Sequence, residues 1–283
     1  MSRCDRQQQN IGVFCGESIR LNRRTKLNEG FRNNKYLVAY VAILILALGC
    51  GQQDDKQAPI ESSSAIEEQA AVVARDDGMG FPATTSSDTA HQQYLAGLAD
   101  FDNARPNTAH QEFINAAQSG PTFAMAHLMA GLSGASTETF RNNLEQATAS
   151  MGNASAAEKL LITSMQQAFD GDSRDVVTTR TEITKLLPNS PRALVFLGFA
   201  HAAEDNSVDA RAAFSQAVSL NPQFVVGHFA LANNLMTQEP NDFTQAEMHF
   251  KHLIAITPNE PNPYDLLGDV HRAQNNFTAA YDD

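Results

Sequence analysis

The sequence has no tryptophan, and only three of its 283 residues are cysteine. These are Cys4, Cys15 and Cys50. If a presequence ending at residue 49 is removed, a single cysteine remains and no internal disulfide can form. Aromatic residues make up only 7% of the chain, as expected where Ala and Leu side chains pack helix against helix.

Basic residues are scarce beyond the first fifty positions. Residues 1–49 hold eight Lys/Arg and three Asp/Glu, whereas residues 50–283 hold twelve and 29, a net charge of −17. Nucleic-acid binding needs cations that neutralise phosphates, so this excess of carboxylates argues against a nucleic-acid partner. It also argues against adsorption to anionic lipid.

Motifs typical of enzymes are missing as well. The chain has no Walker loop, no dinucleotide-binding glycine motif and no Gly-x-Ser-x-Gly elbow. We therefore predict that it is not an enzyme and that it holds no cofactor or metal. His249 and His252 lie at a spacing that can begin a metal site, but no third ligand follows at a recognised spacing. We expect these two histidines to lie on a solvated face.

A repeated pattern of small, large and proline residues runs through the second half of the chain. Its units are Leu197-Gly198, His201, Ala210, Phe214, Pro222; then Leu231-Ala232, Leu235, Ala246, Phe250, Pro258; then Leu267-Gly268, His271, Ala280. The closing prolines Pro188, Pro222 and Pro258 lie 34 and 36 residues apart. A period of about 34 residues predicts a solenoid of helix-turn-helix units.

This pattern resembles the tetratricopeptide repeat. The resemblance implies an all-α, right-handed superhelical solenoid of antiparallel helix pairs. The pairs are expected at 91–121, 122–152, 155–188, 190–222, 224–258 and 261–283. Residues 122–188 keep helical spacing although the repeat signature has drifted, and Ser155 with Glu158 forms a capping-box pattern. Because the last pair is only half covered, we expect the natural polypeptide to continue beyond residue 283.

Glycines at one repeat position have an expected packing role. Gly97, Gly198 and Gly268 interrupt predicted helices, where glycine costs roughly 0.5–1 kcal/mol relative to alanine. We expect them to let the neighbouring helix approach closely. His201 and His271 also share one repeat position, and we expect them to pack between paired helices.

The front of the chain predicts export. Residues 36–49 are uncharged and apolar, follow Arg32 and Lys35, and would rise only about 21 Å as a helix, which indicates a signal peptide. The segment Leu46–Cys50 is similar to a bacterial lipobox, which implies lipidation of Cys50; an uncleaved anchor helix is the alternative. Gly51 in place of aspartate implies, by the same resemblance, an outer-membrane lipoprotein facing the periplasm. The long segment before residue 36 suggests a start codon assigned too far upstream.

Three parts follow from these patterns. Residues 1–49 are expected to be the presequence and lipoprotein signal peptide. Residues 50–90 are polar and are expected to form a disordered, lipid-anchored linker, because so little apolar surface cannot offset the entropy of ordering. Residues 91–283 form the predicted repeat domain.

The face formed by the first helix of each pair is the expected binding groove. The resemblance implies that it is lined by Tyr94, Leu98, Phe101, Arg192, Val195, Phe199, Val226, Phe229, Asn233, Asn262, Asp265, Asp269 and Arg272. Such a lining suits an extended peptide or an amphipathic helix. For Val195, Val226 and Phe229, packing against the adjacent repeat is an equal alternative.

These observations predict an interaction scaffold at the bacterial cell envelope that binds a protein or peptide partner and is attached to the membrane through Cys50. Two alternatives remain. The first is an envelope lipoprotein that captures a small molecule or glycan. The second is the repeat arm of a larger regulatory or enzymatic protein.

Overall fold

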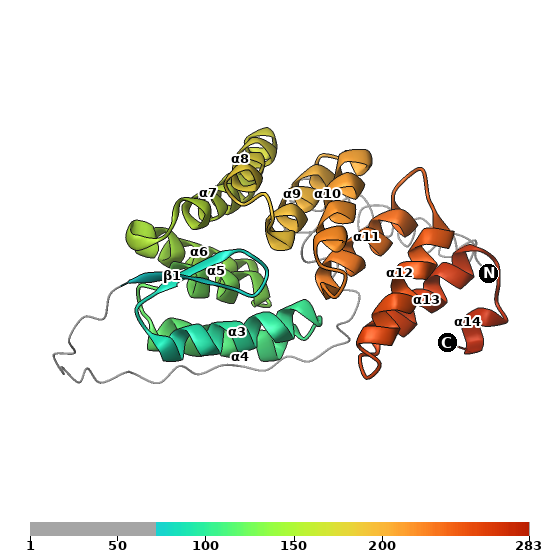
Figure 1. Cartoon of the computed structure of the whole chain (residues 1–283), viewed down its shortest axis with the longest axis horizontal. Coiled ribbons are helices and arrows are strands. Elements are labelled where there is room, and N and C mark those ends of the chain that lie inside the picture. Colours follow the sequence, from blue (N-terminus) through green and yellow to red (C-terminus); the bar gives the residue numbers. More distant parts are fainter. Residues whose placement is uncertain (1–71, 283) are drawn as a thin grey trace, which may run out of the picture.

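A computed structural model describes residues 72–282. A β-hairpin comes first, and antiparallel helix pairs then follow one another along the long axis of the molecule (Figure 1). In chain order the elements are β1 (Val73–Asp76), β2 (Pro82–Thr85), α3 (Asp88–Asp102), α4 (Pro106–Ser119), α5 (Ala124–Ser133), α6 (Thr137–Ser150), η1 (Met151–Asn153), α7 (Ala156–Asp170), α8 (Ser173–Leu186), α9 (Pro191–Ala203), α10 (Ser207–Leu220), α11 (Val225–Thr237), α12 (Phe243–Ile256), α13 (Asn262–Ala273) and α14 (Ala279–Asp282).

The prediction of an all-α solenoid of antiparallel pairs is confirmed. The pairs are α3/α4, α5/α6, α7/α8, α9/α10, α11/α12 and α13/α14, and they include the segment 122–188 in which the repeat signature has drifted. Pro188, Pro222 and Pro258 each lie in the turn between one pair and the next. The capping box at the start of α7 is also present, with Ser155 and Glu158 satisfying each other's backbone N–H groups.

Phenylalanines on the second helix of a pair fill the seam against the first helix. Phe113, Phe214 and Phe250 are at most 1% exposed. A Cβ atom added to Gly97 would lie 2.7 Å from the Phe113 ring, and one added to Gly198 would overlap the Phe214 ring. At these two positions glycine is therefore needed for the approach of the helices, as predicted.

Gly268 differs from the two earlier glycines. A Cβ atom there would meet Arg272 at 3.5 Å and the Ala280 carbonyl oxygen at 3.7 Å, which is ordinary van der Waals contact. The prediction that Gly268 permits a close helix approach is therefore wrong. The described part of α14, Ala279–Asp282, contains no phenylalanine to place against this glycine.

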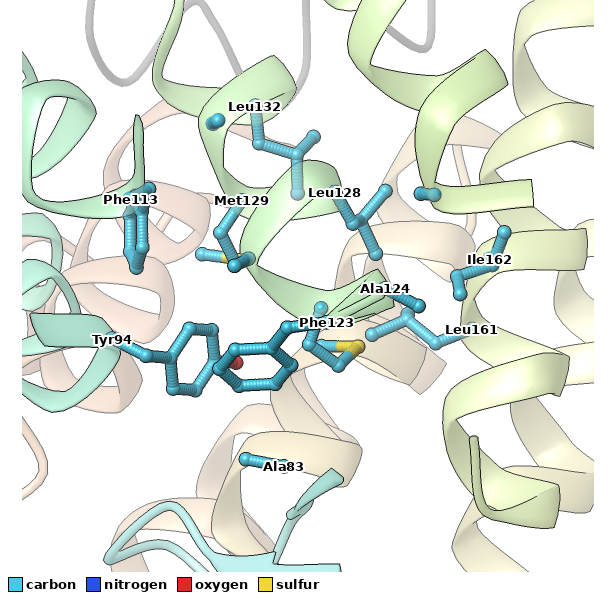
Figure 2. Packing of buried hydrophobic residues seen from close by; sticks show 14 of the residues in the cluster. Ala83, Tyr94, Phe113, Phe123, Ala124, Leu128, Met129, Leu132, Leu161 and Ile162 are labelled. Atoms are coloured by element: carbon cyan, nitrogen blue, oxygen red, sulfur yellow. The ribbon is translucent and has the colours of Figure 1, made fainter. Parts of the chain in front are cut away.

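The first core cluster joins the hairpin to the first helix pairs. Figure 2 shows Tyr94 and Phe113 from α3 and α4 beside Phe123 and Met129, with Ala83 of β2 near the same cluster. A second cluster runs from α9 to α13 and includes the seam phenylalanines of the fourth and fifth pairs.

The hairpin is the main departure from the predicted organisation. Residues 73–76 pair antiparallel with residues 82–85, and α3 begins at Asp88, so the expectation of a disordered linker is wrong for residues 72–90. Phe81 and Ala83 are fully buried against the helices, which supplies the apolar burial that the composition of the segment alone does not suggest.

The remaining predictions for the front of the chain fall outside the described residues. These are the presequence and signal peptide at 1–49, the lipidation of Cys50 and the linker at 50–71. Within residues 72–282, no helix combines the length and the apolar character needed to cross a bilayer.

Candidate partner-binding groove

The first helices of the pairs, α3, α5, α7, α9, α11 and α13, form what we call the inner face of the solenoid. The hairpin packs on this face. Strand β2 contacts α3, α5 and α7, and the loop that joins the strands reaches α9. The chain thus places its own extended segment where the sequence predicted a partner.

Arg192 at the start of α9 binds the hairpin. Its Nε donates to the carboxylate of Asp77, while its two Nη atoms lie 2.9 and 3.0 Å from the carboxylate of Asp102 at the end of α3. The guanidinium also lies 5.3 Å from the ring centroid of Phe224. Burial alone lowers the pKa of Arg192, but the charges of Asp102 and Asp77 outweigh it and raise the pKa well above the ordinary value.

Asp77 also shapes the loop of the hairpin. Its Oδ1 accepts hydrogen bonds from the backbone N–H groups of Met79 at 2.7 Å and of Phe81 at 3.0 Å. Gly78 and Gly80 have φ of +87° and +69°, which residues with a side chain rarely adopt. One buried carboxylate therefore sets the loop and fixes it to α9.

A second buried carboxylate holds β2. Glu158 of α7 is fully buried, and it accepts hydrogen bonds from the Thr84 N–H at 2.7 Å and from the Thr84 hydroxyl. The same carboxylate accepts from the Ser155 N–H at 2.7 Å as part of the capping box. The cap of α7 and the anchor of the hairpin are thus one group.

Aromatic rings complete the contact between hairpin and helices. Phe81 meets Phe196 of α9 edge to face, with ring centroids 5.6 Å apart. Beside them Tyr94 lies 5.6 Å from Phe113 and 5.0 Å from Phe123. Burial raises the pKa of Tyr94 well above its ordinary value, so this phenol stays neutral.

The structure therefore corrects half of the predicted groove. The members that lie on α3 and α9 are buried beneath the hairpin or within the core: Tyr94, Leu98, Phe101, Arg192, Val195 and Phe199. They are not open to a partner while the hairpin is in place. Sequence reasoning missed the residues that cover them, although Asp77-Gly78-Met79-Gly80 is a recognisable turn signal between two short segments.

The members on α11 and α13 keep exposed surface, and their role in binding stays a prediction. Val226, Phe229, Asn233 and Asn262 are at least partly exposed, and so are Asp265, Asp269 and Arg272. Val226 and Phe229 also pack on the second core cluster, so both alternatives raised for them hold in part. Met79, at the tip of the hairpin, packs on the same cluster.

The turn after α3 approaches the turn before α13. Arg105, after α3, lies 2.8 Å from Asp100 and 3.6 Å from Glu260, which precedes α13. This ion pair links the first helix pair to the start of the last.

Histidines are arranged differently from the prediction. His271 is buried, as expected for packing between helices, and its Nε2 lies 3.7 Å from Glu247. His249 and His252 are partly exposed, but they are not simply solvated, because both rings contact His228 of α11. In residues 72–282 no cluster of three or more His, Cys, Asp or Glu side chains is suited to hold a metal ion.

No protein-family model and no curated protein sequence matches the chain. Solved structures of helical repeat proteins are similar in shape. PilW, a widely conserved type IV pilus biogenesis factor, is 15% identical with a TM-score of 0.45, covering 69% of this chain and 90% of its own. TTC0263, a tetratricopeptide repeat protein of Thermus thermophilus, is 13% identical with a TM-score of 0.47, and the match covers 64% of this chain and 98% of that protein. A tetratricopeptide repeat protein of Parabacteroides merdae is 14% identical with a TM-score of 0.42, and the match covers 68% of this chain and 76% of that protein. These likenesses concern the fold alone.

Proposed function

We propose that this protein is an interaction scaffold that holds an extended segment of a partner protein against the inner face of α11 and α13. One observation carries the proposal: the chain's own hairpin occupies the inner face of α3 to α9. The helices there hold an extended backbone through a buried arginine, a buried carboxylate and an aromatic contact. The same face continues beyond the hairpin with Val226, Phe229 and Asn233 still partly exposed.

The charges of this surface define the partner segment. Asp265 and Asp269 lie on α13, and Asp269 already pairs with Arg272. A segment with an apolar side chain against Phe229 and a basic residue near Asp265 would complement the surface. An extended peptide that places side chains in pockets of the surface is one of the recurring modes of peptide recognition.

Photo-crosslinking tests the surface directly. A photoreactive amino acid at Asn233 on the inner face is compared with one at Met248, which is exposed on α12. We expect a discrete crosslinked protein from position 233 and none from position 248. The substitution Asp265→Asn should weaken its binding by about tenfold, which corresponds to one lost charge pair of ~1.4 kcal/mol. Equal crosslinking from both positions would contradict the proposal.

We also propose that the scaffold is anchored in the outer membrane through a lipid on Cys50 and faces the periplasm. The lipobox-like segment ending at this cysteine and the glycine that follows it support this. Cells fed a labelled fatty acid should label the wild-type protein and the Cys15→Ser control, but not Cys50→Ser. Labelling that persists in Cys50→Ser would refute the anchor.

A further inference from the structure

Three histidine rings meet where α11 packs on α12. His228 Nδ1 lies 3.0 Å from His249 Nδ1, and the ring centroids of His228 and His252 are 4.3 Å apart with an angle of 34° between their planes. Two of the rings converge on one oxygen, because the Pro222 carbonyl lies 3.0 Å from His228 Nε2 and 2.8 Å from His252 Nε2.

The positions of the protons follow from these contacts. A carbonyl oxygen can only accept, so the Nε2 atoms of His228 and His252 must both carry a proton. In neutral His228 the Nδ1 atom is then the acceptor, and His249 Nδ1 must donate to it. The neutral cluster therefore has one consistent set of tautomers.

Protonation acts on this set in two steps. A first proton can be shared by the His228–His249 pair, because His249 can move its own hydrogen to Nε2 and leave Nδ1 as an acceptor. A second proton on the pair would place two N–H groups 3.0 Å apart and facing each other. A charge on His252 would add repulsion across the 4.3 Å ring contact.

The contact to the proline carbonyl is not itself the unusual feature. His127 makes it to Pro121 at 3.0 Å in the second pair, and the Tyr264 hydroxyl makes it to Pro258 at 3.2 Å in the sixth. Each donor follows its proline by six residues. In the fifth pair, α12 adds His252 as a second donor to the carbonyl and His249 as a ring that contacts His228.

The charged groups around the cluster do not compensate a charge on it. On α12, Glu247 pairs with Lys251 at 2.7 Å and approaches His271 of α13 at 3.7 Å. On the other helices beside α11, Arg211 of α10 binds Asn234, and Arg192 at the start of α9 lies over Phe224. The charged side chains on α13 are Asp265, Asp269 and Arg272, and the last two form an ion pair with each other. The charges that act on the His228 ring are those of His252 and His249 themselves.

We propose that His228, His249 and His252 form a pH switch that keeps α11 packed on α12 when the rings are neutral and separates the two helices when the cluster takes up a second proton. His228 has the central place, because it contacts both other rings and is almost fully buried.

The direction of the pKa shift of His228 agrees with a cluster that is stable when neutral and destabilised by protonation. Burial, with the charges of His252 and His249 acting in the same direction, lowers the pKa of His228 to about 4, and burial lowers the pKa of His249 as well. Unfolded histidine takes up its proton near pH ~6.5. The unfolded state therefore binds more protons than the folded state below this pH, so stability is full above it and falls as the pH drops. From pH 7 to pH 5, His228 alone raises the unfolding constant about 20-fold.

The switch would act on the partner site. The helix that carries His228 also presents Val226, Phe229 and Asn233 on the inner face, so release of α11 from α12 displaces that surface. Resting on the proposed function, this predicts that the affinity for the bound partner falls as the pH approaches the range near 4 in which His228 takes up its proton. At pH 5 most His228 rings are still neutral, and the partner stays bound.

The first test observes the rings directly in the full-length wild-type protein. Long-range ¹H–¹⁵N NMR at pH 7 should show protonated Nε2 on His228 and His252 and protonated Nδ1 on His249. His228 should titrate below about pH 5. Titration of His228 near its unfolded value, or a different set of tautomers, would overturn the proposal whatever any variant does.

The second test uses His228→Gln, whose amide can donate to Pro222 and accept from His249 but cannot titrate. Urea unfolding is measured at pH 7 and at pH 5 for this variant and for wild type. The ratio of the unfolding constant at pH 5 to that at pH 7 should be about 20-fold smaller in the variant than in wild type. His127→Gln, which alters the same proline contact in the second pair, is the matched control and should retain the contribution of His228 to the pH dependence. Equal pH dependence in His228→Gln and wild type would refute the switch and leave the partner site standing. A pH-sensitive protein without crosslinking at position 233 would refute the partner site alone.

Discussion

At the scale of single residues, Arg192 has two acidic partners that are distant from each other in the sequence. Asp77 reaches it from the hairpin loop and Asp102 from the end of α3. If Asp77 is lost, the guanidinium keeps its two contacts to Asp102, so the cost falls mainly on the backbone N–H groups that Asp77 alone satisfies.

Asp77→Ala should therefore be severely destabilising. It removes one of two partners of Arg192 and leaves the Met79 and Phe81 N–H groups without their acceptor, and we expect a loss of about 3–5 kcal/mol in the free energy of unfolding.

A matched control lies in the same segment. The carboxylate of Asp88 pairs with Arg75 at 2.5 Å, but it is 87% exposed, so Asp88→Ala should cost less than about 1 kcal/mol. Urea denaturation followed by circular dichroism measures both variants. Similar losses for the two would contradict the importance of burial at Arg192.

At the scale of secondary-structure elements, the helix pairs follow from local sequence and the hairpin does not. The spacing of Gly198, Phe214 and Pro222 predicts the fourth pair because contacts within a pair join residues close in the sequence. The hairpin depends on partners 74 positions away for Thr84 and 115 positions away for Asp77. No local periodicity contains that information, so composition alone predicted disorder there.

In the candidate site, too, the features set by local sequence could be predicted and those set by distant contacts could not. The assignment of Phe229 and Asn233 to the inner face followed from repeat position, and the structure places both on α11 with partial exposure. The burial of Tyr94 could not be predicted, because it requires knowing that residues 73–85 lie over it. His228 was missed because its partners His249 and His252 stand on another helix.

Two glycines at the same repeat position should respond in opposite ways to alanine. In Gly198→Ala the new methyl group overlaps the Phe214 ring, and overpacking of this kind should cost about 1–3 kcal/mol. In Gly268→Ala the nearest atom is 3.5 Å away, so the gain in helix propensity should stabilise the protein by about 0.5–1 kcal/mol. Thermal unfolding distinguishes them. A destabilised Gly268→Ala would show that α14 packs more closely than described.

The cap of α7 and the strand β2 should loosen together. Glu158→Ala removes the acceptor of the Thr84 N–H and of the Ser155 N–H in one step. Hydrogen exchange should therefore accelerate at residue 84 and in the first turn of α7, by about tenfold or more for a lost hydrogen bond to a charged group. Ser136→Ala, at the cap of α6, should affect only its own helix. Unchanged exchange at Thr84 in Glu158→Ala would rule out this anchor.

At the scale of the whole molecule, the hairpin changes how the solenoid unfolds. Repeats normally contact only their neighbours, so that each pair can open separately. Here one segment contacts α3, α5, α7 and α9, and it links pairs that are not adjacent in the solenoid. The first four pairs should therefore unfold as one cooperative unit.

Native-state hydrogen exchange in low denaturant tests this cooperativity. In wild type the slowest amides of α5, α7 and α9 should open with the same free energy and the same denaturant dependence. In Phe81→Ala, which removes the ring packed on Phe196, these helices should open with separate free energies. The helices α11 and α13, which the hairpin strands do not cover, should be unaffected. Separate opening already in wild type would contradict the linkage.

The hairpin also restricts how the gene can change in length. Solenoids usually gain and lose repeats without harm, because each unit offers the next the same surface. Residues 77–84 span a fixed distance between Glu158 and Arg192, so one repeat inserted between them would carry the two anchors out of reach of the segment. Descendants of this sequence should therefore keep the number of repeats constant through the fourth pair and vary it only after Leu220.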